Sequence, residues 1–181
     1  MTNDSTKCCS SDHTCCSVNR EKKHIIIDFL YLDLSVCKRC QGAQNNLDLA
    51  IDEVVNVLDA AGYEIIVNKI NINTKQLAIK HEFLSSPTIR LNGNDIEMNV
   101  HESTCQDCGD LCGESVDCRE WHYEGMAYNE PPKAMIINAI LKEVYTEHKN
   151  VEKPKIEYKL PSNLEMFFDG LDKQKSKATQ C

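Results

Sequence analysis

The stretch Ile25-Ile-Ile-Asp-Phe-Leu-Tyr-Leu-Asp-Leu-Ser-Val-Cys37-Lys-Arg-Cys40 decides what the rest of the chain can form. Residues 25–34 are apolar on both faces apart from two aspartates, which is typical of a central β-strand covered on both sides. After Cys40, apolar residues recur every three or four positions until Gly62, so the pattern predicts an amphipathic helix from about 38 to 61. A strand therefore delivers two cysteines to the start of a helix.

These two cysteines, Cys37 and Cys40, form a Cys-x-x-Cys motif at a helix N-terminus. The unpaired N–H groups and partial positive charge of that terminus favour thiolate over thiol, and Lys38 and Arg39 act in the same direction. The combination predicts a redox-active dithiol. Two alternatives stay open: half of a zinc site, since Cys-x-x-Cys is also a metal knuckle, and a structural disulfide, whose short loop would add little stability.

Length and composition restrict the class of protein. A chain of 181 residues is long enough for one domain with a well-filled core and appended segments. The formal net charge of -8 argues against nucleic acid and against an anionic membrane as partner. No apolar run approaches the roughly 18 residues of a membrane span, and the N-terminus lacks the pattern of a signal peptide. We therefore expect a soluble, cytoplasmic protein.

The cysteine content is high for that compartment. The cytoplasm keeps ordinary thiols reduced, so eleven cysteines favour soft-metal binding, thiol chemistry, or both. Residues 1–23 are polar and lack hydrophobic periodicity, which predicts a disordered tail. Two pairs of adjacent cysteines in this tail can place three or four thiolates around arsenite, copper(I) or zinc; the alternative is a thiol-rich tail without a specific ligand. The tail cysteines are Cys8, Cys9, Cys15 and Cys16.

After the first helix, strand-forming and helix-forming patterns alternate. The predicted elements are a strand at 63–72, a short helical crossover at 74–84, strands at 89–91 and 96–100 joined by an Asn-Gly turn, and a helix at 131–148. The expected fold class is therefore α/β, with the order β-α-β-crossover-β-β-α.

In this order the chain resembles the thioredoxin fold over residues 25–148. Three features carry the resemblance: Cys37-Lys-Arg-Cys40 opening a helix after the first strand, Ser-Pro87-Thr before the third strand, and the closing helix. The resemblance implies a thiol–disulfide oxidoreductase in which Cys37 attacks a disulfide of a protein partner and Cys40 resolves the adduct. It also implies that Pro87 is cis and packs beside the dithiol.

The chain departs from thioredoxin itself. Lys38 and Arg39 stand where thioredoxin has Gly-Pro, Val36 stands in place of its tryptophan, and a cysteine-rich insert at 101–120 has no counterpart there. The whole pattern is more similar to a little-characterised family of prokaryotic thioredoxin-like proteins, in which a dithiol is followed by a cysteine-rich loop.

The insert holds a second group of cysteines, spaced C-x2-C-x3-C-x5-C. Four sulfurs in so short a stretch, with two glycines for tight turns, can enclose one tetrahedral ion. Zinc is the first candidate and an iron–sulfur cluster the second, while disulfides or free thiols are the alternatives. No organic cofactor is expected. The four cysteines are Cys105, Cys108, Cys112 and Cys118.

Three regions are expected: the tail at 1–23, a thioredoxin-like domain at 24–149, and a linker with a short amphipathic helix at 150–181. Two functions compete. One is a thiol–disulfide oxidoreductase, and the other is a non-enzymatic carrier of soft metal or arsenite. The vicinal pairs of the tail are similar to the paired cysteines of an arsenite metallochaperone that also has a thioredoxin-like fold.

Overall fold

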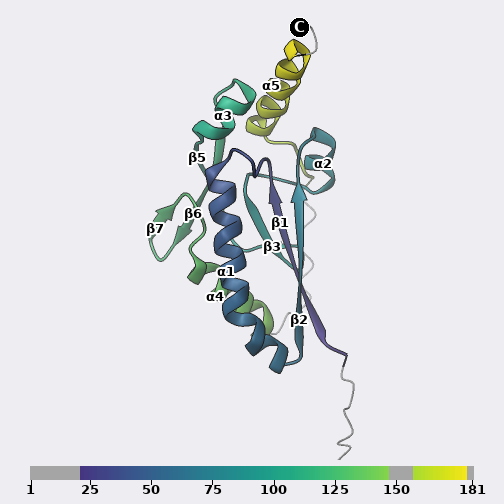
Figure 1. The fold of residues 1–181 in the computed structure, drawn as a ribbon, viewed down its shortest axis with the longest axis vertical. Coiled ribbons are helices and arrows are strands. Elements are labelled where there is room, and N and C mark those ends of the chain that lie inside the picture. The colour runs from purple at the N-terminus through teal and green to yellow at the C-terminus, as the bar shows by residue number, and fades with distance from the viewer. Residues whose placement is uncertain (1–20, 147–156, 179–181) are drawn as a thin grey trace, which may run out of the picture.

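The computed structural model describes residues 21–146 and 157–178. The four tail cysteines and Cys181 lie outside these residues. Five helices and seven strands of the described part form an α/β fold with two sheets (Figure 1). Within the same residues, no helix is both long and apolar enough to cross a membrane.

The first sheet has the strand order β2-β1-β3-β4, so the strand that contains Ile25 is central, as the sequence predicts. β1 is parallel to β2 and antiparallel to β3, and β3 is antiparallel to β4. Parallel neighbours need a connection that crosses one face of the sheet, and α1 makes this crossing. The elements of this half are β1 (Lys23–Tyr31), α1 (Lys38–Ala60), β2 (Tyr63–Asn71), α2 (Lys75–Lys80), β3 (Thr88–Leu91) and β4 (Asn94–Asp95).

The second sheet is a small antiparallel one with the order β5-β6-β7. A short helix, α3, lies between β5 and β6 in the sequence, and α5 packs beside α3 and α2 at one end of the molecule (Figure 1). The remaining elements are β5 (His101–Thr104), α3 (Gln106–Cys112), β6 (Asp117–Tyr123), β7 (Met126–Tyr128), α4 (Lys133–Tyr145) and α5 (Ser162–Ala178), of which α4 packs on α1 and β3 of the first sheet.

Two groups of buried residues form the interior. The first, which we call the apolar core, lies between the sheet and the helices α1 and α4 and includes Ile25, Ile27, Phe29, Leu47 and Ile136. The second, which we call the sulfur core, lies where α1 and α3 begin. It combines the six described cysteines with apolar residues that include Leu30, Leu32, Leu164, Phe167 and Phe168.

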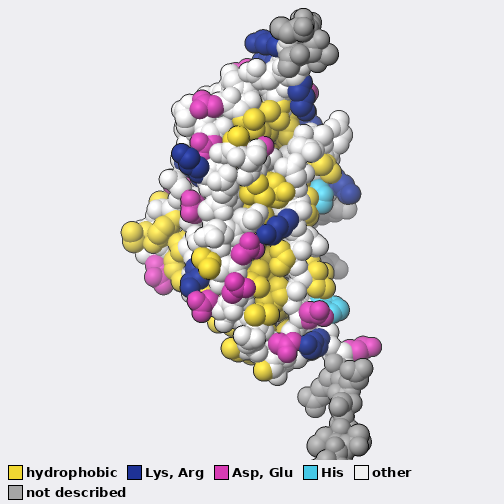
Figure 2. All heavy atoms as spheres, viewed as in Figure 1, with side chains coloured by type: hydrophobic (Ala, Val, Ile, Leu, Met, Phe, Trp, Pro, Cys, Tyr) yellow, Lys and Arg dark blue, Asp and Glu magenta, His cyan; other side chains and the backbone are white. Residues whose placement is uncertain are grey.

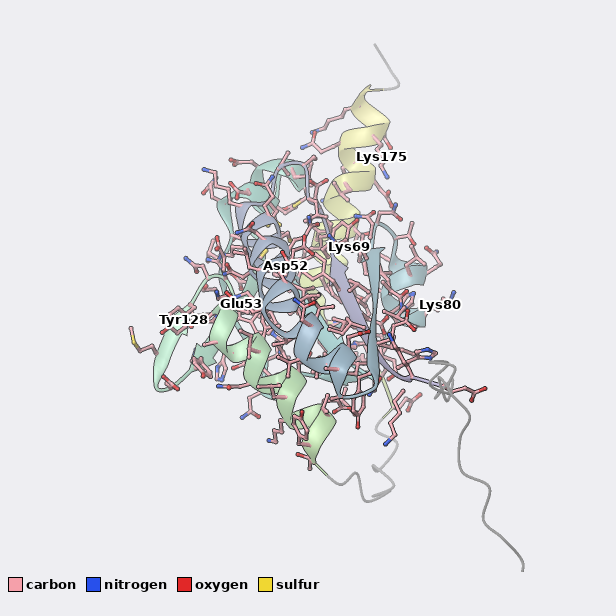
Figure 3. All side chains as sticks on the ribbon, turned by 60° about the horizontal axis from the view of Figure 1, so that its bottom comes forward. Asp52, Glu53, Lys69, Lys80, Tyr128 and Lys175 are labelled. Atoms are coloured by element: carbon pink, nitrogen blue, oxygen red, sulfur yellow. The ribbon has the colours of Figure 1, made fainter. Side chains whose placement is uncertain are left out.

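Exposed ion pairs link α1 to both of its neighbours. Glu53 pairs with Lys133 of α4 at 2.7 Å, and Asp48 pairs with Lys69 of β2 at 3.2 Å. One member of each pair, Glu53 and Lys69, is labelled in Figure 3. Figure 2 shows acidic and basic side chains dispersed over the visible face, with hydrophobic patches between them. Exposed pairs contribute only about 0–1 kcal/mol each, so the packing beneath them holds these elements together.

Three elements differ from the sequence predictions. The strand expected at 96–100 is replaced by the two-residue β4, because the buried Arg119 guanidinium pairs with both carboxylate oxygens of Asp95 (2.7 and 2.9 Å). Asp95 also accepts the N–H of Glu97 at 2.9 Å, which turns the chain out of the sheet. The helix expected at 131–148 is the shorter α4. Part of the loop expected at 105–118 is the helix α3.

Candidate metal centre

Four cysteine sulfurs converge in the sulfur core. Their Sγ atoms all lie within 4.8 Å of one another, and all four side chains are buried. Zinc–sulfur bonds of about 2.3 Å place the sulfurs of a tetrahedral site about 3.8 Å apart, so the group is close to the size that one ion requires. No other group of His, Cys, Asp or Glu in the described residues has this geometry. The four are Cys37, Cys105, Cys108 and Cys118.

Two of these cysteines stand at helix N-termini. Cys37 is the N-cap residue of α1 and Cys105 is the N-cap residue of α3, each with extended backbone. The N–H of Cys108 donates to the sulfur of Cys105. The positive ends of two helix dipoles therefore meet at the sulfurs, which stabilises thiolate charge there.

Hydrogen bonds among the sulfurs divide the charge unequally. Hydrogen bonds from Cys105, and then from Cys108 and Cys118, hold the pKa of Cys37 well below its ordinary value. Hydrogen bonds from Cys108 and Cys118 lower the pKa of Cys105 to about 7. The pKa values of Cys108 and Cys118 are raised, chiefly because each donates to Cys105. The thiolate charge is thus concentrated on the two N-cap cysteines.

The fourth sulfur comes from a strand, and side chains of α1 fix that strand in place. Cys118 lies on β6 opposite Ser103 of β5, and its Sγ is 3.3 Å from that of Cys108. The Arg39 guanidinium donates to the carbonyls of Ser103 (3.2 Å), Thr104 (3.0 Å) and Cys118 (3.2 Å). Arg39, which lies between the two cysteines of the motif, therefore ties the start of α1 to the β5–β6 hairpin.

A second tie joins α1 to α3. The backbone N–H of Lys38, in the first turn of α1, donates to the Asp107 carboxylate at 2.8 Å. Segments far apart in the sequence are held together in this way, and the four sulfurs come from three of them. Because the sulfurs approach only when these segments are packed, the site depends on the tertiary structure.

A comparison with protein-family models identifies the family of the chain. The chain belongs to the family described as a domain of unknown function (DUF2703). The match covers residues 25–140. Searches of the curated proteins and of the solved structures gave no match. The DUF2703 range contains all four sulfurs of the site, and it ends before α5 begins.

The third cysteine of the insert, Cys112, lies outside the four-sulfur group. It is buried beside α5, and its thiol faces the carbonyls of Gly109 (3.8 Å) and Glu114 (3.7 Å). Burial raises its pKa. A helix rises 1.5 Å per residue, so Cys112 stands about 10 Å along the axis from Cys105, too far to share one ion. Cys37 occupies the place that the sequence analysis gave to Cys112.

The other half of the dithiol motif, Cys40, is also outside the group but next to it. Cys40 is fully buried, its thiol donates a hydrogen bond to the sulfur of Cys37, and its Sγ lies 3.3 Å from Ser86 Oγ. The hydrogen bond to Cys37, with burial second, raises the pKa of Cys40. The peptide bond between Ser86 and Pro87 is cis, as expected.

The structure also bears on the predicted disulfides and on the predicted role of Cys37. No disulfide joins the six described cysteines, and the 3.3 Å between Cys108 and Cys118 is well beyond an S–S bond of about 2.05 Å. The resemblance implies that Cys37 attacks a disulfide, but its side chain is fully buried. The sequence analysis gives Cys37 a metal only in the alternative of half a zinc site, so its place among the insert cysteines was missed. The seven-residue separation of Cys105 and Cys112 was the available signal, because it places the two too far apart along a helix to share one ion.

Proposed function

We propose that this chain is a soft-metal-binding protein built on a thioredoxin-like scaffold, with one ion held by the four clustered cysteines. The observation that carries the proposal is the convergence of four buried sulfurs, from three separate segments, within 4.8 Å of one another. Free cysteines are often buried as small apolar residues, but four of them at the spacing of one tetrahedral ion match the usual structural zinc site.

Zinc is the proposed occupant. A donor set of four cysteines selects zinc or iron among the common cellular metals, because thiolate is a soft ligand. Four protein ligands leave no open position for water or substrate, which is typical of a structural rather than a catalytic ion. The two helix N-termini, with Lys38 and Arg39 beside them, offset the negative charge that four thiolates bring to the ion.

The thioredoxin-like part of the proposal is supported by the topology of the first sheet. Its elements β1, α1, β2, α2, β3 and β4 follow the β-α-β-crossover-β-β order that the sequence analysis predicts, and they form one sheet with β1 parallel to β2 and β3 antiparallel to its neighbours. The position of the Pro87 loop supports it too, since Ser86 contacts Cys40 at the start of α1.

A thiol–disulfide oxidoreductase is the second candidate. The observation in its favour is Cys37 at the N-cap of α1, with a lowered pKa and with Cys40 hydrogen-bonded beside it. Its substrate would be a disulfide of a protein partner. Metal binding is the better supported function, because both sulfurs are fully buried and Cys37 faces three further thiols.

Elemental analysis of the full chain, purified without oxygen and without added metal, tests the proposal. We expect one zinc per chain, and after exchange with cobalt we expect the charge-transfer bands of a four-thiolate site. A variant with Cys8, Cys9, Cys15 and Cys16 all replaced by Ser removes the tail as a source of binding. In that background, Cys118→Ser should lose the ion and Cys112→Ser should keep it.

Cys112→Ser is a matched control because its thiol is buried in the same core and makes only weak contacts with two carbonyls, which a hydroxyl can replace. Equal loss of metal from both variants would contradict the ligand set. Absence of any stoichiometric metal, in the purified protein and after addition of zinc, would contradict the function.

A further inference from the structure

One sulfur of the metal centre is also hydrogen-bonded to a thiol that is not among the four ligands. Cys37 is hydrogen-bonded to the three other sulfurs of the site and also to Cys40. Cys40 itself is excluded from the four-sulfur group. Among the described cysteines, Cys37 is thus hydrogen-bonded both to sulfurs of the metal centre and to a thiol outside it.

The loop that contains Ser86 holds Cys40 in this position. Its Sγ lies 3.3 Å from Ser86 Oγ, which also accepts the backbone N–H of Leu32 at 3.1 Å. The next segment is fixed as well, because the N–H of Arg119 donates to the Ser86 carbonyl at 2.7 Å. None of these hydrogen bonds of the Ser86 loop involves the sulfur of a metal-centre cysteine, so the position of Cys40 does not depend on an ion.

We propose that Cys37 has two mutually exclusive partners, the metal ion and Cys40, so that a Cys37–Cys40 disulfide opens the metal centre and bound metal protects the dithiol from oxidation. The inference rests on the proposed function, because it takes Cys37 to be a ligand. It adds a thiol–disulfide activity that belongs to the metal-free state, and it makes the protein responsive to both zinc and redox conditions.

The oxidant in this scheme is a low-molecular-weight disulfide. In the metal-free state, the Cys37 thiolate attacks one sulfur of the small disulfide, whose S–S bond breaks and releases one thiolate. Cys40 gives its proton to that thiolate, and its sulfur then attacks the Cys37 sulfur and displaces the second thiolate. The protein dithiol loses two electrons and the small disulfide gains them. Cys105, Cys108 and Cys118 remain as thiols, and three ligands would hold an ion more weakly than four.

The two equilibria must then be linked reciprocally. If zinc binds the reduced form and binds the oxidised form much more weakly, zinc must make oxidation harder by the same factor by which oxidation weakens zinc binding. Each tenfold rise in free zinc, between the dissociation constants of the two forms, should shift the ratio [GSH]²/[GSSG] at half-oxidation about tenfold toward oxidising conditions.

The test equilibrates the full chain in glutathione redox buffers at several buffered concentrations of free zinc. Disulfides are located by mass spectrometry after alkylation and trypsin digestion. Trypsin cuts after Lys38 and Arg39, so a Cys37–Cys40 disulfide is detected as two linked peptides. Zinc released from the protein is measured with a coloured chelator in the same samples.

Cys40→Ser should bind one zinc per chain but lose the linked peptides and the release of zinc at the midpoint of the wild type. Cys40→Ala is a second variant in case the serine disturbs the contact with Ser86. Cys112→Ser, a buried thiol outside both groups, should keep the wild-type midpoint and its dependence on zinc. A zinc-dependent midpoint in the wild type that Cys40→Ser abolishes is the expected result.

Two results would overturn the inference and leave the metal site in place: a midpoint that does not move with zinc, or linked peptides that join Cys37 to a cysteine other than Cys40. A reduced wild-type protein that binds no zinc at all would instead contradict the proposed function. The two failures are therefore distinguishable in one experiment.

Discussion

The apolar core and the sulfur core share one strand but are stabilised in different ways. In the apolar core, Ile25, Ile27 and Phe29 of β1 pack against α1 and α4, and burial of their side chains is favourable without any particular geometry. In the sulfur core, the next buried residues of the chain, Leu30 and Leu32, lie among six cysteines. Thiols are small and polarisable, and four of them lie close enough together to hold one ion.

This difference in composition predicts which of the two cores is sensitive to metal concentration and redox conditions. An apolar core responds to temperature and denaturant, whereas a thiolate core responds to metal concentration and redox conditions as well. The helix α1 contributes to both cores. Its first residues belong to the sulfur core, and its later residues, among them Leu47 and Leu58, fill the apolar core. The predictions below separate the two cores.

The largest effect is expected from loss of a metal ligand. Cys108→Ser should abolish the stabilisation that zinc gives, which is about 4 kcal/mol when free zinc exceeds the dissociation constant about 1,000-fold. Urea unfolding of wild type and variant, with buffered zinc and with a chelator, measures this difference. With the chelator the two proteins should have similar stabilities. A variant that still gained stability from zinc would place the ion elsewhere.

A substitution in the apolar core should act independently of metal. Leu47 is fully buried under the sheet, so Leu47→Ala should cost about 3 kcal/mol through lost burial and the cavity that remains. The loss should be the same with zinc and with a chelator, and the bound zinc should stay at one per chain. Loss of zinc from this variant would mean that the two cores cannot be treated separately.

A smaller effect is expected where α5 packs on α3. A Cβ atom at Gly170 would lie 2.5 Å from the carbonyl oxygen of Cys112 and 3.0 Å from its Cβ, so Gly170→Ala must push α5 away. Overpacking of this kind costs about 1–3 kcal/mol. Differential scanning calorimetry should detect a lower Tm with zinc stoichiometry unchanged, and Ser176→Ala, on the exposed part of α5, serves as the control. An unchanged Tm for Gly170→Ala would show that α5 is not held against α3 at this point.

The smallest expected effect concerns α2, which contributes Ala78 to the sulfur core. The Thr74 hydroxyl accepts the N–H of Leu77 at 3.2 Å and caps this helix. Thr74→Ala should lower the free energy of unfolding by about 1 kcal/mol, with and without zinc, because the hydroxyl caps a helix and is not a metal ligand. Thr74→Ser keeps the oxygen and should restore most of the loss. A cost that appeared only with zinc bound would link the cap to the metal centre.

Much of the first sheet could be predicted from local patterns. The apolar run at 25–34 is the central strand, the period after Cys40 is α1, and the Asn92-Gly93 turn leads from β3 to β4. The strand expected at 96–100 was not formed, because its end is controlled by Arg119, whose partner Asp95 is 24 residues away in the sequence. No local pattern contains that interaction.

The sequence by itself determined that the chain carries a Cys-x-x-Cys motif at a helix start and a second group of cysteines with ligand spacing. Only the tertiary structure decided which four sulfurs meet. Helical geometry separates Cys112 from Cys105 along the axis of α3, and the packing of α1 against α3 and β6 brings Cys37 into the vacant position. Spacing along a chain limits which ligands can share an ion, but the choice among them depends on contacts between distant segments.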